Sequence, residues 1–233
     1  MPKINVKRKS YIIYVKRIIE NDCDIIFVAS PNKERELQAK ALGVKLEYIP
    51  IGKEAFVFLV NASNPLNNIS VEQVKKIYSG EYKYWSSLGV YGIGKIRPFQ
   101  RANGSGSQTI LEQIMGDTPI IEKKQEDYED FMNGMIYSVA ADEGYKNYNN
   151  AIGYSFRFYA TKMVTSDKIK LLSVNGVAPT VENIKNGTYP FAGDFYAVVR
   201  DDCSEETRAL VNFILSEQGQ YLVEDTGYVK INE

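Results

Sequence analysis

An α/β fold in two lobes is the architecture that the sequence predicts, and three observations favour it. Short apolar runs at residues 25–29 and 55–60 have the composition of buried strands. Segments with apolar residues at helical spacing lie between such runs, so strands and helices alternate along the chain. The 233 residues are 44% hydrophobic and 24% charged, which suits one large or two small globular domains and excludes a disordered or collagen-like chain.

The N-terminal elements have the rhythm of a doubly wound α/β unit. Residues 11–20 carry apolar side chains at helical spacing, which predicts a helix. The continuous apolar run at residues 25–29 is typical of a strand buried on both faces in a parallel sheet. Residues 31–42 are charged and favour a helix that stops at Gly43.

The next elements are a strand at residues 55–60 and a helix capped by Ser70. Gln73, three residues after Ser70, completes a capping box, and Gly80 ends the helix. We expect Val74, Ile77 and Tyr78 to be buried and Trp85 to be a structural anchor. Further on, the pattern predicts strands at 96–100, 151–156 and 196–199, a helix at 109–115, and one long helix over 205–222 with Leu210, Val211, Ile214 and Leu215 facing inward.

Residues 101–109 (RANGSGSQT), between a predicted strand and a predicted helix, are the most informative segment. Glycines let the backbone approach a ligand, and the first helical turn has N–H groups without intrahelical acceptors. The Ser105 and Ser107 hydroxyls and the planar Arg101 guanidinium add donors, so the segment predicts an anion site. The alternative is that a serine only caps the helix and Arg101 is a surface charge. The segment matches neither the P-loop nor the dinucleotide fingerprint.

Several segments, in this order along the chain, carry a resemblance to a known family. They are residues 24–31 (DIIFVASP), 50–60 (PIGKEAFVFLV), 64–85 (NPLNNISVEQVKKIYSGEYKYW), 98–109 (PFQRANGSGSQT), 151–156 (AIGYSF) and 226–229 (TGYV). Together they resemble the phosphate-binding substrate receptors of ABC transporters, which have the type 2 periplasmic-binding-protein fold. The resemblance extends over roughly residues 12–232, and the motif at 101–107 is its most specific part.

The resemblance implies which residues hold phosphate or a similar tetrahedral oxyanion. Ser30 would contribute from the opposite lobe, although it could equally be a capping residue ahead of Pro31. Residues 1–10 would supply the preceding strand and ligand loop, with Ser10 at the anion. The residues matching the family's main anion motif are Arg101, Ser105, Gly106 and Ser107.

The resemblance also implies a function without catalysis. The protein would be a monomer that captures the anion between its lobes and docks on the membrane permease of an ABC transporter, with no cofactor. Its location would be extracytoplasmic, in a periplasm or as a lipoprotein anchored at the cell surface, with the export signal not present in this chain. We expect lobe 1 to comprise residues 1–56 and 190–233, lobe 2 to comprise residues 57–189, and hinges at 56–60 and 189–196.

The N-terminal third departs from the family in two respects. Compared with the family, the sequence starts one strand-helix unit late, and Lys7, Arg8 and Lys9 stand where the ligand loop usually has small residues. Pro31 replaces an aspartate that in the family accepts the proton of hydrogen phosphate and repels sulfate. Glu54 could substitute for that aspartate, but a solvated surface role is the simpler expectation.

Composition excludes several other classes of function. The formal net charge is −1 without a broad basic patch, so nucleic acid is not an expected partner. There is no histidine, and Cys23 and Cys203 have no CxxC partner, so neither a metal site nor a Cys/His nucleophile is expected. Separate thiols are favoured over a disulfide, but both remain open.

Two alternative functions remain open. One is an enzyme acting on a phosphorylated small molecule, with candidate carboxylates at Asp127, Glu129 and Asp130, a cluster also expected of a solvated helix face. The other is a degenerate family member that serves as an anion sensor or interaction module, suggested by the basic residues 7–9.

Overall fold

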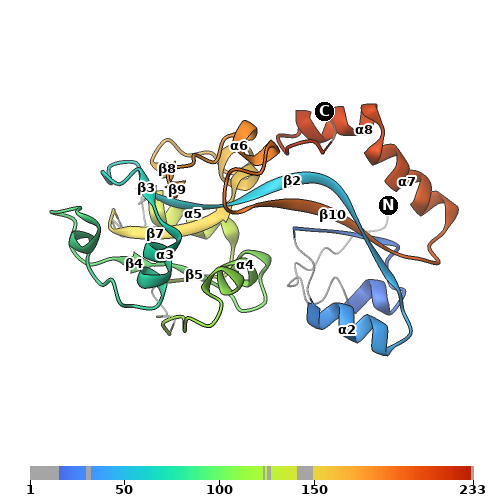
Figure 1. The fold of residues 1–233 in the computed structure, drawn as a ribbon, viewed down its shortest axis with the longest axis horizontal. Coiled ribbons are helices and arrows are strands. Elements are labelled where there is room, and N and C mark those ends of the chain that lie inside the picture. The colour runs from blue at the N-terminus through green and yellow to red at the C-terminus, as the bar shows by residue number, and fades with distance from the viewer. Residues whose placement is uncertain (1–15, 30–32, 123, 125–126, 141–148, 232–233) are drawn as a thin grey trace, which may run out of the picture.

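The protein folds into two α/β lobes joined by two long strands, as the sequence predicted (Figure 1). The structure, a computed structural model, describes residues 16–29, 33–122, 124, 127–140 and 149–231. The joining strands are β2 (Leu46–Asn61) and β10 (Ala192–Arg200). The exact lobe boundaries, after residues 56 and 189, stay predictions.

Helices and strands alternate along much of the chain. The helices are α2 (Lys33–Ala41), α3 (Val71–Tyr78), α4 (Gly106–Met115), α5 (Met132–Ala140), α6 (Val181–Lys185), α7 (Glu205–Leu215) and α8 (Glu217–Asp225), with a 3-10 turn at Trp85–Leu88 and a π-helical turn at Tyr159–Met163. The other strands are β1 (Ile25–Val28), β3 (Asn68–Ile69), β4 (Arg97–Pro98), β5 (Gln100–Arg101), β6 (Tyr128–Glu129), β7 (Ala151–Phe156), β8 (Ile169–Leu171) and β9 (Ser173–Val174).

One sheet runs through both lobes because β2 changes partner along its length. Its first part pairs antiparallel with β10 as far as Ala55, and from Phe56 onward it pairs antiparallel with β7. The strand order is β1-β10-β2-β7-β4, with β8 beside β2. The sequence pattern revealed only the apolar half of β2, because Pro50 and Gly52 interrupt the other half.

The expectation of a parallel, fully buried strand at residues 25–29 is wrong. β1 pairs antiparallel with β10, the strand that returns from the C-terminal part of the chain. Phe27 is 48% exposed. It lines an apolar cavity with Phe213 and Leu222, so α7 and α8 leave this face of the strand partly open.

Lobe 2 contains the larger core, and the predicted helix at Ser70 packs into it. The Ser70 hydroxyl accepts the Gln73 amide at 3.0 Å and the Gln73 side chain accepts the Ser70 amide at 2.8 Å, which confirms the capping box. Trp85 is fully buried, and its indole N–H donates to the Asn150 carbonyl at 2.8 Å, as expected of an anchor. The predicted buried stripe is also confirmed: Val74, Ile77 and Tyr78.

Three further boundaries differ from the predicted ones. The strand expected at 96–100 is two short strands, β4 and β5, separated by Phe99. Helix α4 begins at Gly106 rather than at residue 109, because Ser105 is its cap. The long helix expected over 205–222 is broken at Ser216, and Leu210 is 44% exposed while Val211 is buried.

Candidate functional site

The predicted anion motif forms the turn between β5 and helix α4. Gly104 has a φ of 73°, a left-handed conformation that glycine adopts at little cost. The Ser105 side chain caps α4 by accepting the Gln108 amide at 3.3 Å. A Cβ added at Gly106 would meet no atom within 4 Å, so the first turn of α4 borders open space. A ligand can therefore approach the N–H groups at the start of this helix.

Ser107 is a buried polar residue at the same helix start. Only 1% of the residue is exposed, and its hydroxyl has no hydrogen-bond partner among the described residues. A buried hydroxyl without a partner costs about 1–3 kcal/mol, so such groups are unusual away from binding sites. The Ser107 hydroxyl is therefore able to bond to a ligand, because no described residue forms a hydrogen bond with it.

Arg101 is buried, so the alternative of a surface charge is wrong. It is 7% exposed, its Nε donates to the Glu129 carbonyl at 3.0 Å, and its Nη2 donates to the Asp130 carbonyl at 2.9 Å. Burial lowers the pKa of the Arg101 guanidinium, which nevertheless stays charged near neutrality. Because backbone carbonyls engage Nε and Nη2, they fix the orientation of the guanidinium plane against β6 and Asp130.

Sequence reasoning missed two residues that hold the Arg101 backbone. The Arg101 amide donates to the Tyr154 hydroxyl at 2.8 Å and to Gln108 Oε1 at 3.1 Å. Tyr154 in turn donates to the same Gln108 oxygen. Gln108 belongs to the motif, so its polar side chain could have been recognised as a partner of Arg101. Tyr154 is 53 residues away from Arg101 in the sequence, and no sequence pattern indicates this contact.

Glu54 lies at a cavity between the lobes, which corrects the expectation of a solvated side chain. It is 8% exposed, and its carboxylate accepts the Ala55 amide at 2.8 Å and the Phe158 amide at 3.3 Å. Burial raises the pKa of Glu54 to about 7. The cavity, about 280 Å³, is lined by Ala29, Glu54, Phe56, Ile110, Gln113, Ile114, Phe156, Phe191, Ala192 and Gly193.

This cavity brings α4 opposite lobe 1. Ala29 directly follows β1 of lobe 1, whereas Ile110 and Ile114 belong to the helix that begins at the anion motif. Ser30, the expected contributor from lobe 1, and Ser10 both lie outside the described residues. The four motif residues lie on β5 and at the start of α4, whereas these two serines stay predictions.

The three candidate catalytic carboxylates do not form the solvated helix face that was expected. Asp127 is buried and its Oδ1 accepts Arg97 Nη2 at 2.5 Å. The Glu129 carboxylate, on β6, accepts the Ser138 hydroxyl, and Asp130 supplies the carbonyl that holds Arg101. Across the described ranges, no three His, Cys, Asp or Glu residues gather in a metal-binding geometry.

The two cysteines are not joined in this structure. Cys23 and Cys203 are both partly exposed free thiols.

Among the helices of the described residues, none has the length and apolar character needed to cross a membrane.

Two α/β lobes, two crossing strands and a cavity between the lobes that α4 borders through Ile110, Gln113 and Ile114 are the arrangement of a binding protein of the periplasmic receptor class. Residues 15–218 match the family described as the PBP superfamily domain, and the chain belongs to that family. The type 2 receptor fold that the sequence resemblance implied is thereby confirmed.

Curated relatives carry phosphate-related names. The chain is 28% identical over 203 residues to the phosphate-binding protein PstS of Bacillus subtilis, covering 86% of this chain and 62% of that protein. It is 24% identical over 232 residues to protein SphX of Synechococcus elongatus, covering 93% of this chain and 65% of that protein. The chain thus spans a little under two thirds of the length of these two relatives.

Solved structures share the fold. A structure described as a phosphate ABC transporter substrate-binding protein from Clostridium perfringens, with bound phosphate, superposes with a TM-score of 0.78 at 26% identity, covering 94% of this chain and 83% of that one. An ABC-type phosphate transport receptor from Vibrio cholerae superposes with a TM-score of 0.70 at 21% identity, covering 93% and 83%.

Proposed function

We propose that this protein captures inorganic phosphate, or a similar tetrahedral oxyanion, between its lobes for an ABC transporter and catalyses no reaction. The observation that carries the proposal is the buried hydroxyl of Ser107 at the start of α4, which has no hydrogen-bond partner among the described residues. Arg101, six residues earlier in the same motif, supplies a buried guanidinium. The names of the PstS relatives and the phosphate in the Clostridium perfringens structure support the choice of phosphate.

In this proposal the anion takes its hydrogen bonds from the motif residues. The first-turn amides of α4 and the Ser107 hydroxyl donate to the oxygens, and the open space at Gly106 lets the anion approach the backbone. The Ser105 oxygen accepts the Gln108 amide, so its proton can still point to the anion. Arg101, oriented by the carbonyls of β6 and the following residue, supplies the positive charge.

The lobes act together in the proposed capture. We propose the divisions stated above, residues 1–56 with 190–233 and residues 57–189, with Ser10 and Ser30 completing the site from lobe 1. Binding would close the lobes about β2 and β10, and the closed form would dock on a membrane permease.

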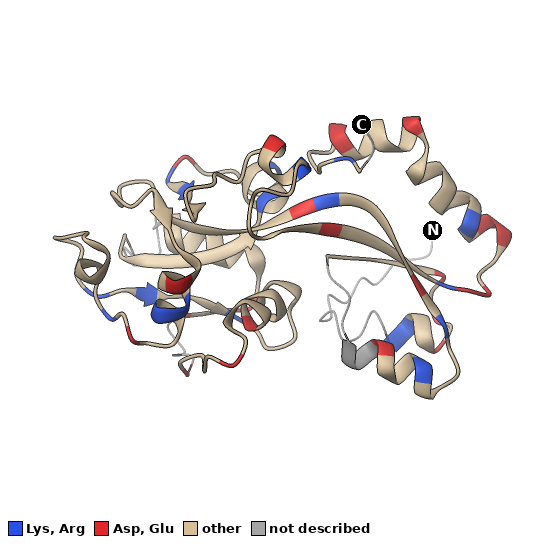
Figure 2. Cartoon of the chain, in the orientation of Figure 1, with Lys and Arg blue, Asp and Glu red and all other residues tan. Residues whose placement is uncertain are grey.

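The proposed setting is an extracytoplasmic one, with the protein acting as a monomer. Figure 2 shows Lys and Arg interspersed with Asp and Glu along both lobes, and the formal net charge is −1. This distribution does not suit a nucleic-acid partner, so we propose none.

Isothermal titration with phosphate and with sulfate tests the proposal. We expect phosphate to bind, Arg101→Ala to weaken binding by about 2 kcal/mol, and Ser107→Ala to weaken it by about 1 kcal/mol, because each removes a hydrogen-bond donor to the anion. Ser87→Ala, an exposed serine in the 3-10 turn of lobe 2, is the matched control and should leave the affinity unchanged.

Two results would contradict the proposed function. One is the absence of phosphate binding at millimolar concentration. The other is equal affinity in the wild type and in Ser107→Ala, a variant that loses only one hydroxyl and therefore keeps the fold even if Arg101→Ala does not.

A further inference from the structure

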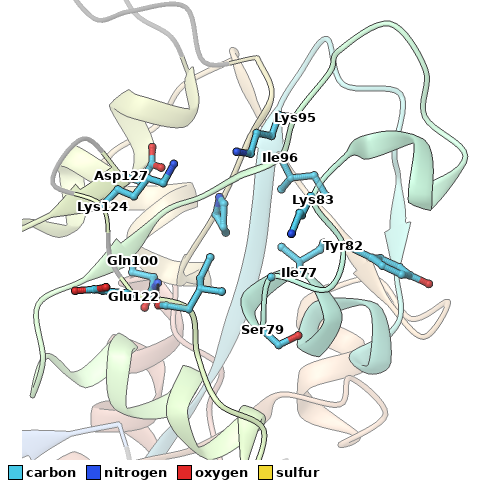
Figure 3. A pocket seen from close by; sticks show the side chains of 13 residues that line it. Ile77, Ser79, Tyr82, Lys83, Lys95, Ile96, Gln100, Glu122, Lys124 and Asp127 are labelled. Atoms are coloured by element: carbon cyan, nitrogen blue, oxygen red, sulfur yellow. Dashed lines mark hydrogen bonds between the residues drawn. The ribbon is translucent and has the colours of Figure 1, made fainter.

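Lobe 2 contains a second cavity on the opposite side of β5 from the anion motif. Successive side chains on a strand point to opposite faces, so Gln100 faces this cavity while Arg101 points toward β6 and the residue after it. Figure 3 shows Gln100 and Lys124 on one wall. The other wall, at the end of α3, includes Ile77 and Lys83. The cavity volume is about 420 Å³, a size that suits a small organic molecule.

Part of the cavity lining is apolar. Ile77 and Ile96 are buried core residues whose side chains also border the cavity, and Pro98 and Ile121 extend this surface. Such a lining favours the hydrocarbon or aromatic body of a ligand over a bare inorganic ion, since burial of apolar surface is favourable.

The Gln100 side-chain amide has one polar atom without a partner among the described residues. The residue is 1% exposed, and its Nε2 donates to the Ile121 carbonyl at 3.0 Å. Its Oε1 has no hydrogen-bond partner among the described residues. An amide oxygen buried without a donor is costly, so this position calls for a ligand group that carries an O–H or N–H.

Three lysines give the cavity its charge. Lys83, Lys95 and Lys124 are exposed at the cavity, and no carboxylate of a described residue pairs with any of them within 4.0 Å. Of the two carboxylates in the lining, Asp127 is held by Arg97 at 2.5 Å, and only Glu122 opposes the lysines. The charge therefore favours an anionic ligand.

We propose that this cavity binds a small organic anion that also carries a hydrogen-bond donor, such as a hydroxycarboxylic acid. Its anionic end lies at the three lysines, its body packs on the isoleucines, and its donor meets Gln100 Oε1. The cavity shares no residue with the anion motif, so the site is independent of the proposed phosphate capture.

The test uses 4-hydroxybenzoate as the probe, because it combines a carboxylate, an aromatic body and a phenolic O–H. Titration calorimetry is run with saturating phosphate, which occupies the site between the lobes. We expect saturable binding, with benzoate about fivefold weaker because it lacks the donor. We expect 4-hydroxybenzyl alcohol to bind about tenfold more weakly because it lacks the charge.

Variants locate the probe. The triple substitution Lys83→Gln, Lys95→Gln and Lys124→Gln should weaken 4-hydroxybenzoate about tenfold or more. The matched triple substitution Lys40→Gln, Lys162→Gln and Lys185→Gln removes the same charge from exposed lysines outside this cavity and should leave binding unchanged.

Three outcomes would overturn the inference. They are no binding of 4-hydroxybenzoate at about 10 mM, equal affinity for benzoate, and equal effects of the two triple substitutions. Should phosphate itself fail to bind, the same titrations without phosphate still test this cavity, so failure of the proposed function and failure of this inference are distinguishable.

Discussion

Glu54 is a carboxyl group whose ionisation is linked to folding. Burial raises its pKa from 4.5 to about 7, because the charged form loses hydration that two backbone amides only partly replace. The folded state therefore holds the proton more tightly than the unfolded state. This proton stabilises the folded state fully below about pH 4.5. The stabilisation is lost progressively as the pH rises to about 7, and the free energy of unfolding falls by about 3 kcal/mol in total.

Replacement of Glu54 by glutamine should remove this pH dependence, because the amide oxygen still accepts a backbone N–H but carries no charge. We expect Glu54→Gln to be more stable than the wild type at pH 8, by up to about 3 kcal/mol, with the difference disappearing near pH 4. Urea unfolding at a series of pH values measures it. Glu36→Gln, at an exposed site on α2, should follow the wild-type curve. A difference for Glu54→Gln that is constant across pH would refute this explanation.

The break between α7 and α8 shows how one short segment shapes lobe 1. The Ser216 hydroxyl accepts the Gly219 amide at 3.2 Å and thereby starts a new helix. Gln220 then donates to the carbonyls of Ile51 and Ile214, at 2.8 Å and 3.0 Å. These bonds hold α8 against β2, so the break directs the C-terminal helix back to the crossing strand.

Gly219 is the residue that allows this tight junction. A Cβ at Gly219 would overlap the carbonyl oxygens of Phe213 and Ile214, which are backbone atoms and cannot move aside independently. We expect Gly219→Ala to destabilise the protein by about 1–3 kcal/mol, measured by urea unfolding. Gly193→Ala is the matched control, because an added Cβ there meets nothing within 4 Å. Equal stabilities of the two variants would show that the junction relaxes freely.

At the scale of the whole molecule, β2 and β10 carry the connection between the lobes. Their pairing contains a register shift between Phe195 and Tyr196, close to the place where β2 changes partner. Tyr228 stacks on Phe158 at 4.2 Å and on Phe195 at 5.1 Å, which joins the end of the chain to the crossing strand β10 and to the segment that follows β7. We expect bending between the lobes to occur at this short stretch of the two strands.

Closure on phosphate should be visible in solution. We expect phosphate to lower the radius of gyration measured by small-angle X-ray scattering. At a phosphate concentration of about 100 times the dissociation constant, we also expect stabilisation against unfolding by about 2.7 kcal/mol. Arg101→Ala, with an affinity expected to be about 30-fold lower, should be stabilised by only about 0.8 kcal/mol at the same phosphate concentration and should show a smaller decrease in the radius of gyration. An unchanged radius of gyration together with measurable binding would mean that capture does not close the lobes.

Local chemistry in the sequence determined the α/β alternation, the capping box at Ser70 and the glycine-serine turn before α4, because each depends on residues a few positions apart. The family followed from such segments taken in order. Only the tertiary structure decided the burial of Arg101 and Glu54, the role of Tyr154, and the antiparallel pairing of β1 with β10. These features depend on contacts between residues that are distant in the chain, and hydrophobic periodicity carries no record of which distant segment becomes the partner.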